Sequence, residues 1–250
     1  MQNIQDHILD GTPADIVTRY ESLSEFAEQA DFGVLDRNVV VVDTETTGLS
    51  FSHDELIQIA AARLERGEII DWYVTFVNPG QFLTEDIIEL THIHDEDLIG
   101  APDPNEALVG LAEFVGDALV VAHNATFDKH FCTKHPGGYP LLENRWIDSL
   151  DLSRVGLPRL RSHRLLDLVR AFGAPTSTHR ADDDVAATCV VYRILLASIA
   201  MMPTSLVEAI GDMAPEAEWP TGYVFREMAK LQNSRSEAEG EPTEDVSRET

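Results

Sequence analysis

The sequence is poor in cysteine, in long apolar segments and in basic residues. Its two cysteines, Cys132 and Cys189, have a separation that suits neither a disulfide framework nor a metal-binding pair. The longest largely apolar run, residues 194–202, is far shorter than the roughly 20 residues of a membrane-spanning helix. The first ten residues lack the basic start and apolar stretch of a secretory signal. We therefore expect a protein that spans no membrane and works in the reducing cytoplasm.

The shortage of basic residues argues against nucleic-acid binding, but their distribution argues for it. The chain has 18 lysines and arginines against 44 acidic residues, a net charge of −26, whereas phosphate binding normally draws on a surplus of positive charge. Residues 129–180 nevertheless hold nine basic and four acidic residues. A polyanion could bind this middle region, especially if cations occupy an acidic site nearby.

The apolar content of 44% and the length of 250 residues are ordinary for a globular chain with a sizeable core. Four valines before Asp43 are apolar on both faces and predict a buried, central strand. Arg66 and Gly67 predict a hairpin turn between two further strands. Apolar spacing and Gly or Pro boundaries predict helices at 13–30, 105–115, 126–135, 163–172 and 181–199, and strands at 56–65, 70–78, 118–122 and, at an edge, 145–148. Strands first in a hairpin and then alternating with helices predict a mixed α/β sheet.

The two ends of the chain differ from its middle. Residues 1–36 predict an N-terminal helical extension to a main domain at 37–200. Short apolar clusters in 201–232 indicate a small C-terminal extension, which is suited to docking. Residues 233–250 are rich in Ser, Glu, Arg and Gly with almost no apolar content, so we expect an acidic, disordered tail.

Acidic residues stand where predicted strands end or helices begin. Asp43 and Glu45 lie two apart on a strand, hence on one face and about 7 Å apart by backbone rise, so both can reach one cation or a close pair. Asp128 and Asp184 each fall in the first turn of a predicted helix. Taken singly, each position also suits an ordinary polar turn or helix start. Together they point to a site for Mg²⁺ or Mn²⁺, because clustered carboxylates are costly unless a cation pairs them.

The segments DTETTGL (43–49), HNATFD (123–128) and HRADDD (179–184), in this order, resemble the three motifs of the DEDDh 3′–5′ exonucleases. This DnaQ-like group includes the epsilon proofreading subunit of bacterial DNA polymerase III, RNase T and oligoribonuclease. The resemblance covers roughly residues 39–199, including SHRLLDLVRAFGAP at 162–175. It implies an RNase H-like mixed five-stranded sheet flanked by helices, here with an N-terminal helix and a C-terminal extension.

The resemblance also implies roles for the acidic residues and for a histidine. The residues that would bind two divalent metal ions, Mg²⁺ or Mn²⁺, are Asp43, Glu45, Asp128 and Asp184. His179, five residues before Asp184, would be the general base, whereas the tyrosine variant of the family has its Tyr at the position of Arg180. Two cations about 4 Å apart can activate a water and stabilise the attacking and leaving oxygens, and imidazole titrates near neutral pH. Asp183 is the alternative ligand if the helix starts in another register. Asp182 lies in the same first turn and is not expected to bind the metal.

The resemblance further implies substrate contacts. The residues that would meet the terminal nucleotide are Thr46, Thr47, Gly48 and Leu49, with Ile93 as a candidate base contact and Asn124, with His123, orienting Asp128 or the substrate. His92 departs from the family, because relatives often have a glycine there. The basic residues Arg154, Arg159, Arg161, His163 and Arg164 either contact the strand backbone or are ordinary solvated surface.

The predicted function is a metal-dependent 3′–5′ exonuclease that releases nucleoside 5′-monophosphates from single-stranded or frayed nucleic-acid 3′ ends. DNA proofreading or repair is the preferred role, and RNA trimming by an enzyme of the same family is the alternative. A non-catalytic interaction module is the less favoured hypothesis, because no expected metal ligand is missing. Residues 201–250 are a candidate tether to a polymerase or another replication or repair protein.

Overall fold

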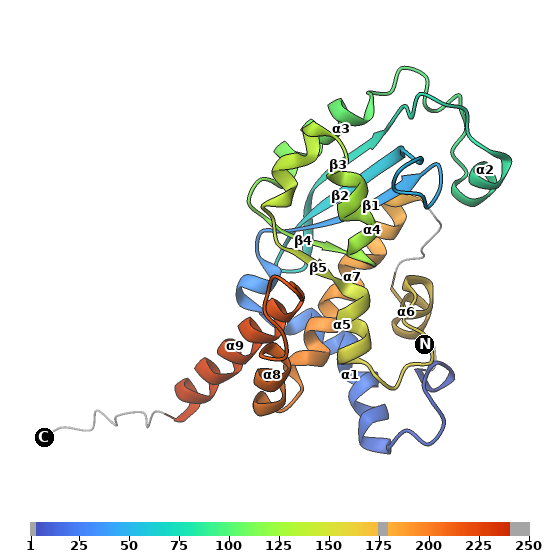
Figure 1. Ribbon diagram of the computed structural model, residues 1–250. Coiled ribbons are helices and arrows are strands. Elements are labelled where there is room, and N and C mark those ends of the chain that lie inside the picture. Colours follow the sequence, from blue (N-terminus) through green and yellow to red (C-terminus); the bar gives the residue numbers. More distant parts are fainter. Residues whose placement is uncertain (1–3, 175–179, 241–250) are drawn as a thin grey trace, which may run out of the picture.

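The computed structural model describes residues 4–174 and 180–240, and their strands form one five-stranded mixed sheet (Figure 1). The strands are β1 (Val39–Thr46), β2 (Leu56–Glu65), β3 (Glu68–Phe76), β4 (Leu119–Ala122) and β5 (Trp146–Asp148). Their order is β3-β2-β1-β4-β5; β1, β2 and β3 pair antiparallel, and β4 and β5 continue parallel to β1. The predicted mixed α/β sheet is therefore confirmed, with β1 at its centre and β5 at an edge.

Helices cover both faces of this sheet. The α-helices are α1 (Ala14–Gln29), α2 (Glu85–Thr91), α3 (Pro104–Val115), α4 (Ala125–Cys132), α5 (Ser149–Gly156), α6 (Leu165–Phe172), α7 (Ala181–Ala200), α8 (Thr204–Gly211) and α9 (Gly222–Gly240), and the short 3₁₀ helices are η1 (Ile4–His7), η2 (Gly33–Asp36) and η3 (Pro136–Leu142). In the part of the chain that is described, no single helix has the length and apolar content to cross a membrane. Only α7 and α8 taken together, with a bend of 115° between them, reach that length and composition.

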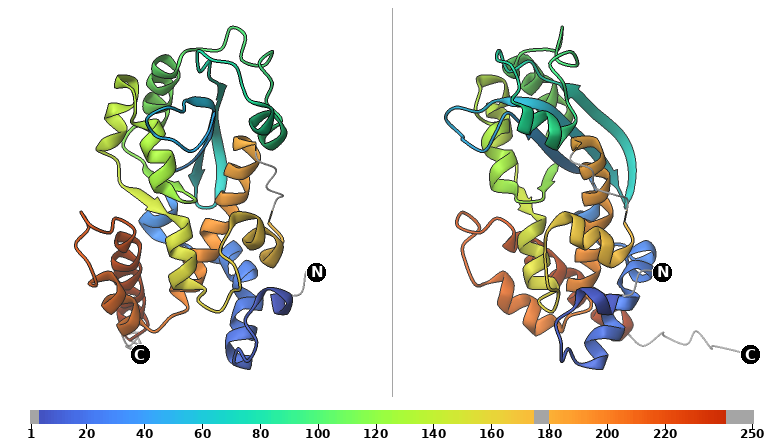
Figure 2. Two further views of the ribbon diagram at one scale, coloured as in Figure 1. Left: turned by 45° about the vertical axis from the view of Figure 1, so that its right-hand side comes forward. Right: turned by 90° about the vertical axis from the view of Figure 1, so that its right-hand side faces the viewer.

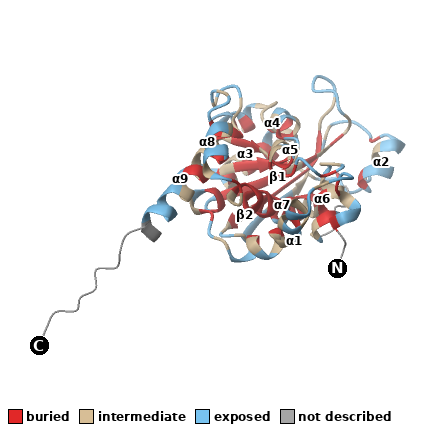
Figure 3. Cartoon of the chain, turned by 90° about the horizontal axis from the view of Figure 1, so that it is seen from below, coloured by how far each residue is buried: buried red, intermediate tan, exposed pale blue. Residues whose placement is uncertain are grey.

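The valines of β1 explain why this strand is central. Val39 and Val41 pack into the core that contains α1 and α7, whereas Val40 and Val42 pack into the core beneath α3 and α4. All four are at most 1% exposed, and Figure 3 shows the buried strands between the two helical layers. A strand with both faces covered needs apolar residues at consecutive positions. By the same alternation, Asp43 continues the face that meets α7.

The β2–β3 hairpin turns at Arg66 and Gly67, as predicted. Both residues have positive φ, 53° and 85°, as a two-residue type I′ turn requires. A Cβ atom on Gly67 would lie 2.4 Å from Nε of Arg193. Glycine is therefore needed at this turn both for its backbone conformation and for the close approach of α7.

Several helix boundaries differ from the predictions. Helix α4 ends at Cys132 rather than near 135, and the chain continues in η3. Helices α2 and α5 were not predicted, because each is short and begins at a side-chain cap rather than showing a long apolar period. Thr84 accepts a hydrogen bond from Ile87 N at the start of α2, and Asp148 accepts one from Leu150 N at the start of α5.

The C-terminal helix is longer than the sequence indicated. Disorder was expected from residue 233, but α9 continues to Gly240. Polar contacts support it where apolar residues run out: Gln232 Nε2 donates to the carbonyls of Ala200 and Met202, and Asn233 Nδ2 donates to Glu208 Oε1. Helices α8 and α9 lie at the opposite end of the molecule from α2 (Figure 2). The rest of the expected tail, 241–250, lies outside the described residues.

Candidate active site

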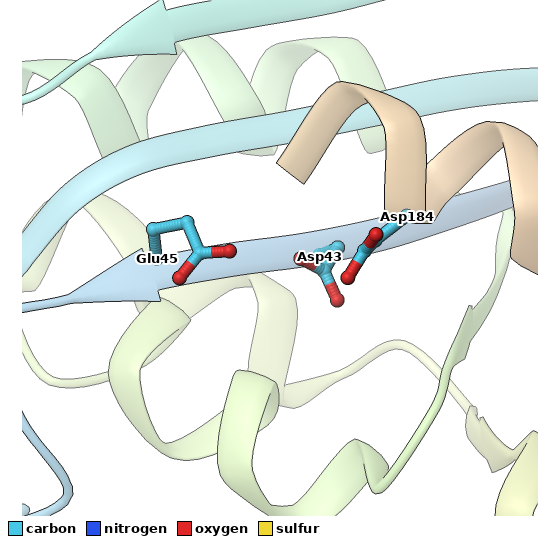
Figure 4. A group of neighbouring side chains, drawn as sticks. All are labelled: Asp43, Glu45 and Asp184. Carbon is cyan, nitrogen blue, oxygen red and sulfur yellow. The ribbon is translucent and has the colours of Figure 1, made fainter. Parts of the chain in front are cut away.

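Three carboxylates from two elements meet beside the end of β1. Asp43 and Glu45 project from β1 and Asp184 from the first turn of α7, and one oxygen of each lies within 4.8 Å of the others. Figure 4 shows the Asp43 and Asp184 carboxylates side by side, with Glu45 further along the strand. The strand spacing predicted the first pair, and packing of α7 against β1 brings the third.

Asp128 lies next to this group. It projects from α4, is 3% exposed, and its Oδ1 accepts a hydrogen bond from Thr44 Oγ1 at 2.9 Å. Thr44 lies between Asp43 and Glu45 on the strand, so this bond ties α4 to the carboxylate pair. The negative charge of Asp128 acts on both Asp43 and Glu45. The four acidic residues singled out in the sequence thus occupy one region.

The carboxylates strongly perturb one another. Burial, followed by the charges of Asp128, Asp184 and Glu45, raises the pKa of Asp43 well above its usual range. Burial and the charges of Asp184 and Asp128 raise the pKa of Glu45 to about 8. Burial raises the pKa of Asp128 to about 7, although the Thr44 hydrogen bond opposes this. Such a group is costly when fully ionised, and its hard oxygen donors fit a divalent cation such as Mg²⁺ or Mn²⁺.

The aspartates of HRADDD are not equivalent in the structure. Asp184 is 8% exposed and belongs to the carboxylate group. Asp182 instead forms an ion pair with Arg180, with Oδ1 and Nε 3.4 Å apart, and both side chains are largely solvated. The register in which α7 starts at Ala181 therefore turns the third aspartate inward. His179, predicted as the general base, lies outside the described residues.

The loop after Glu45 is held from inside by Asp54. Thr47 Oγ1 donates to Asp54 Oδ1 at 2.9 Å, and Ser50 N donates to Asp54 Oδ2 at 2.7 Å. A Cβ atom on Gly48 would lie 2.6 Å from Asp54 Oδ2, so a larger residue here would displace the Asp54 carboxylate. The next side chain, Leu49, is 82% exposed. The loop thus presents an apolar side chain from a firmly anchored backbone.

Thr46 and Thr47 are occupied within the protein. Thr46 is buried, and its Oγ1 donates to the carbonyl of Gly48 at 2.6 Å. Thr47 Oγ1 also accepts from Glu55 N and from Gln81 Nε2, at 3.0 and 3.1 Å. Both hydroxyls therefore shape the loop that carries Leu49.

Lys134 and His135 support the same loop from outside. Lys134 Nζ donates to Glu55 Oε1 at 2.7 Å and to the carbonyl of Asp54 at 2.6 Å, and His135 Nε2 lies 2.8 Å from Glu55 Oε2. Burial acts to raise the pKa of Glu55, but the Lys134 and His135 hydrogen bonds outweigh it and lower that pKa. This network was not predicted, because its members are about 80 positions apart in the sequence and match no motif.

Two predicted substrate contacts, Ile93 and Asn124, differ in their exposure. Ile93 is 1% exposed and packs in a small core with Ile57, Leu83 and Leu98. It presents no surface to a base in this conformation, so its prediction as a base contact is not supported. Asn124 is exposed at the start of α4 with a φ of 77°, and its N–H donates to Asp148 Oδ1 at 3.1 Å.

Two histidines that the sequence analysis singled out, His123 and His92, differ in their surroundings. His123 donates from Nε2 to the carbonyl of His163 at 3.0 Å, and its Nδ1 lies 2.9 Å from Ser149 Oγ. Burial lowers the pKa of His123 to about 4, so it is neutral at pH 7 and anchors the segment around 163. His92 is exposed and ends α2 with a φ of 56°, a left-handed conformation that a glycine adopts without strain.

Comparisons with known proteins agree with this site. The exonuclease family model matches residues 40–192, from β1 into α7. The PolC-type DNA polymerase III of Staphylococcus aureus is 42% identical over 168 residues, which are 65% of this chain. The match spans 12% of that polymerase, so it concerns one part of a much longer protein.

Solved exonucleases share the fold. E. coli exonuclease I in complex with a dT13 oligonucleotide has a TM-score of 0.58 at 18% identity, covering 72% of this chain and 44% of that one. Exonuclease X in complex with 5′ overhanging duplex DNA has a TM-score of 0.53 at 21% identity, covering 63% and 90%. A 3′-exonuclease bound to a histone mRNA stem-loop has a TM-score of 0.51 at 16% identity, covering 72% and 71%.

At these identities the solved structures show the fold alone, which is the RNase H-like fold that the motifs implied. Family membership rests on the sequence match, which covers more than half of the chain and contains Asp43, Glu45, Asp128 and Asp184. The chain therefore belongs to the exonuclease family, in its DnaQ-like group.

Proposed function

We propose that this protein is a metal-dependent 3′–5′ exonuclease that releases nucleoside 5′-monophosphates from single-stranded or frayed 3′ ends. The observation that carries the proposal is the convergence of Asp43, Glu45 and Asp184 within 4.8 Å, with Asp128 beside them. A cluster of buried carboxylates is costly on its own and suits cation-assisted phosphodiester hydrolysis. Membership of the exonuclease family supports the same chemistry.

The chain's own residues divide the work in this proposal. Asp43, Glu45 and Asp184 hold the divalent cations, and Asp128 adds the oxygen that Thr44 does not bind. When bound, two Mg²⁺ or Mn²⁺ ions would activate the attacking water and stabilise charge on the attacking and leaving oxygens. His179 accepts the proton of that water, because imidazole titrates near neutral pH. Its assignment rests on the five-residue spacing from Asp184.

The loop after Glu45 would receive the terminal nucleotide. Leu49 is 82% exposed beside the carboxylates' strand, so its side chain is free to pack on the terminal base. Recognition through stacking and backbone contacts tolerates any sequence, as an enzyme that removes successive nucleotides requires. Thr46, Thr47 and Gly48 contribute by holding the backbone of this loop in place.

DNA is the preferred substrate and a polymerase the preferred partner. The relative from Staphylococcus aureus is a DNA polymerase, and the exonuclease I and exonuclease X structures hold DNA. This kinship fits a replication or repair role in the cytoplasm, with a polymerase or similar protein as the partner. RNA trimming is the second candidate, because a histone-mRNA exonuclease shares the fold.

A digestion experiment tests the proposal. A 5′-labelled oligonucleotide incubated with the protein and Mg²⁺ or Mn²⁺ should give a ladder that shortens one nucleotide at a time, with no products in EDTA. Matched DNA and RNA strands, single-stranded and mispaired, identify the preferred substrate. Full activity in Asp43→Ala protein would refute the assignment. If a 3′-labelled strand instead gave a ladder of shortened products that keep the label, digestion would start at the 5′ end. That result would refute the proposed polarity.

A further inference from the structure

Helix α7 begins without a capping side chain of its own. Its N-cap residue, Arg180, accepts no side-chain capping hydrogen bond from a helix N–H, and the first N–H groups of a helix have no partner within it. Gln58 on β2 fills this role from 123 positions away. Its Oε1 accepts a hydrogen bond from the N–H of Ala181 at 3.2 Å. A side chain of the sheet thus holds the first N–H group of α7.

Gln58 also lies beside one of the carboxylates. It is the direct register partner of Glu45 across the β1–β2 pair, and directly paired strand residues have Cβ atoms about 4.5–5.5 Å apart on the same face. The side chain of Gln58 is 1% exposed. One buried residue therefore touches the helix that carries Asp184 and adjoins the strand residue Glu45.

An amide suits this position better than the usual helix caps. The common caps include aspartate, but another carboxylate here would add charge next to Glu45, whose ionisation is already opposed by burial and by Asp184 and Asp128. The Gln58 amide accepts the Ala181 hydrogen bond without adding a charge. Asp184 lies in the same first turn, three residues after Ala181, so a shift of that turn moves its carboxylate directly.

We propose that Gln58 is a positioning residue for the metal site: it holds the first turn of α7 so that Asp184 meets Asp43 and Glu45. The inference rests on the metal site in the proposed function, but it concerns cation binding and not the choice of nucleic acid. It assigns Gln58 no contact with substrate. Its prediction is that the Gln58–Ala181 bond matters for cation affinity more than for the stability of the fold.

The test uses Gln58→Met in the full chain, a substitution that keeps side-chain length and removes the acceptor. Mn²⁺ binding is measured without nucleic acid, by the electron paramagnetic resonance signal of free Mn²⁺, alongside kcat, KM and the melting temperature. The dissociation constant for Mn²⁺ should rise about tenfold, the size expected for one buried hydrogen bond. At subsaturating Mn²⁺, kcat should fall by a similar factor, with the KM for oligonucleotide within about threefold of the native value.

Two further variants isolate the bond. Ala181→Pro removes the donor at the first helical position, where proline is tolerated, and should weaken Mn²⁺ binding as Gln58→Met does. Asp103→Ala removes a comparable bond, from Glu106 N at 2.9 Å at the start of α3. It should lower the melting temperature without changing Mn²⁺ affinity.

The outcomes separate this inference from the proposed function. If Gln58→Met melts earlier but binds Mn²⁺ like the native protein, Gln58 only supports the fold and the inference is wrong. If Gln58→Met does not fold, the Mn²⁺ affinity of Ala181→Pro, which lacks the hydrogen-bond donor, tests the inference in its place. If the native protein binds Mn²⁺ but cleaves no nucleic acid, the proposed function fails, while the Mn²⁺ titrations still decide the role of Gln58.

Discussion

Two groups of buried or half-buried carboxylates in the described part of the chain differ in their surroundings. Asp36, which is 2% exposed, is paired with Arg193, with Oδ2 and Nη1 2.7 Å apart. At the end of β1, Asp43 and Glu45 lie with Asp184, and within 4–174 and 180–240 neither of the two β1 carboxylates forms an ion pair with a lysine, arginine or histidine. The first site supplies its own cation and joins three elements. The second site has the oxygen donors for a divalent cation taken from solution. Cation-assisted phosphodiester hydrolysis requires such an arrangement.

The largest expected effect separates the inward aspartate of α7 from its solvated neighbour. Asp184→Asn removes a carboxylate from the cluster and should lower cleavage of a labelled oligonucleotide by at least about a thousandfold, because the substitution weakens cation binding and charge stabilisation together. Asp182→Asn is the matched control: it breaks only the solvated pair with Arg180 and should retain most activity. Equal losses in the two variants would contradict the assignment of Asp184.

The Asp36–Arg193 pair should show the opposite behaviour, a loss of stability without a loss of catalysis. Removing Arg193 leaves a buried carboxylate unpaired, which typically costs about 3–5 kcal/mol. For a domain of this size that corresponds to a melting temperature lower by roughly 10 °C. Arg193→Met should show this fall in calorimetry, with kcat at 20 °C unchanged. The double variant Arg193→Met, Asp36→Leu should recover part of the stability. A large fall in kcat for folded Arg193→Met would show that the two sites are coupled.

The sequence predicted the elements that have a strong period and the residues that belong to ordered motifs. The valine run indicated a central strand because both of its faces are apolar, and the spacing in HRADDD indicated Asp184 because the register of α7 decides which aspartate turns inward. What could not be predicted depends on tertiary contacts. Gln58 carries no motif, and its partner Ala181 is 123 positions away.

The same limit explains the predictions that differ from the structure. Ile93 was a candidate base contact because of the family resemblance, but it packs with Ile57 and Leu83 and is buried. Disorder was expected from residue 233 because 233–240 lack apolar periodicity, whereas α9 continues to Gly240 and polar bonds from Gln232 and Asn233 help to hold this helix. Composition alone does not report hydrogen bonds between distant segments.

The carboxylates at the end of β1 should also make the stability of the metal-free protein depend on pH. In the metal-free protein the pKa of Glu45 is about 8 and that of Asp128 about 7, against about 4 for such groups in an unfolded chain. The folded state therefore binds these protons more tightly, and their contribution to stability, complete below pH about 4, is lost as pH rises to about 8. In EDTA, the melting temperature should be higher at pH 5 than at pH 8 by several degrees, and Mn²⁺ should remove most of the difference.

Glu45→Gln isolates this effect from the other titrating groups. An amide has no proton to lose, so the metal-free variant should lose less stability than the native protein between pH 5 and pH 8. Its oligonucleotide cleavage should nevertheless fall sharply, because a cation ligand is gone. An identical slope of melting temperature against pH in the two proteins would show that Glu45 is not strained in the metal-free state.

The smallest expected effect concerns the loop that follows Glu45. Leu49 is 82% exposed and makes no contribution to the core, so Leu49→Ala should leave the melting temperature within about 1 °C of the native value. If the side chain packs on the terminal base, its loss should raise the KM for a single-stranded oligonucleotide about three- to tenfold, since stacking contacts contribute about 1–3 kcal/mol per base and a leucine supplies only part of that.

Ile99→Ala is the control, because Ile99 is equally exposed at 81% but lies outside the motif loops. A rise in KM confined to Leu49→Ala would assign the base contact to the loop, whereas equal values would leave the carboxylates and the strand backbone as the determinants of binding.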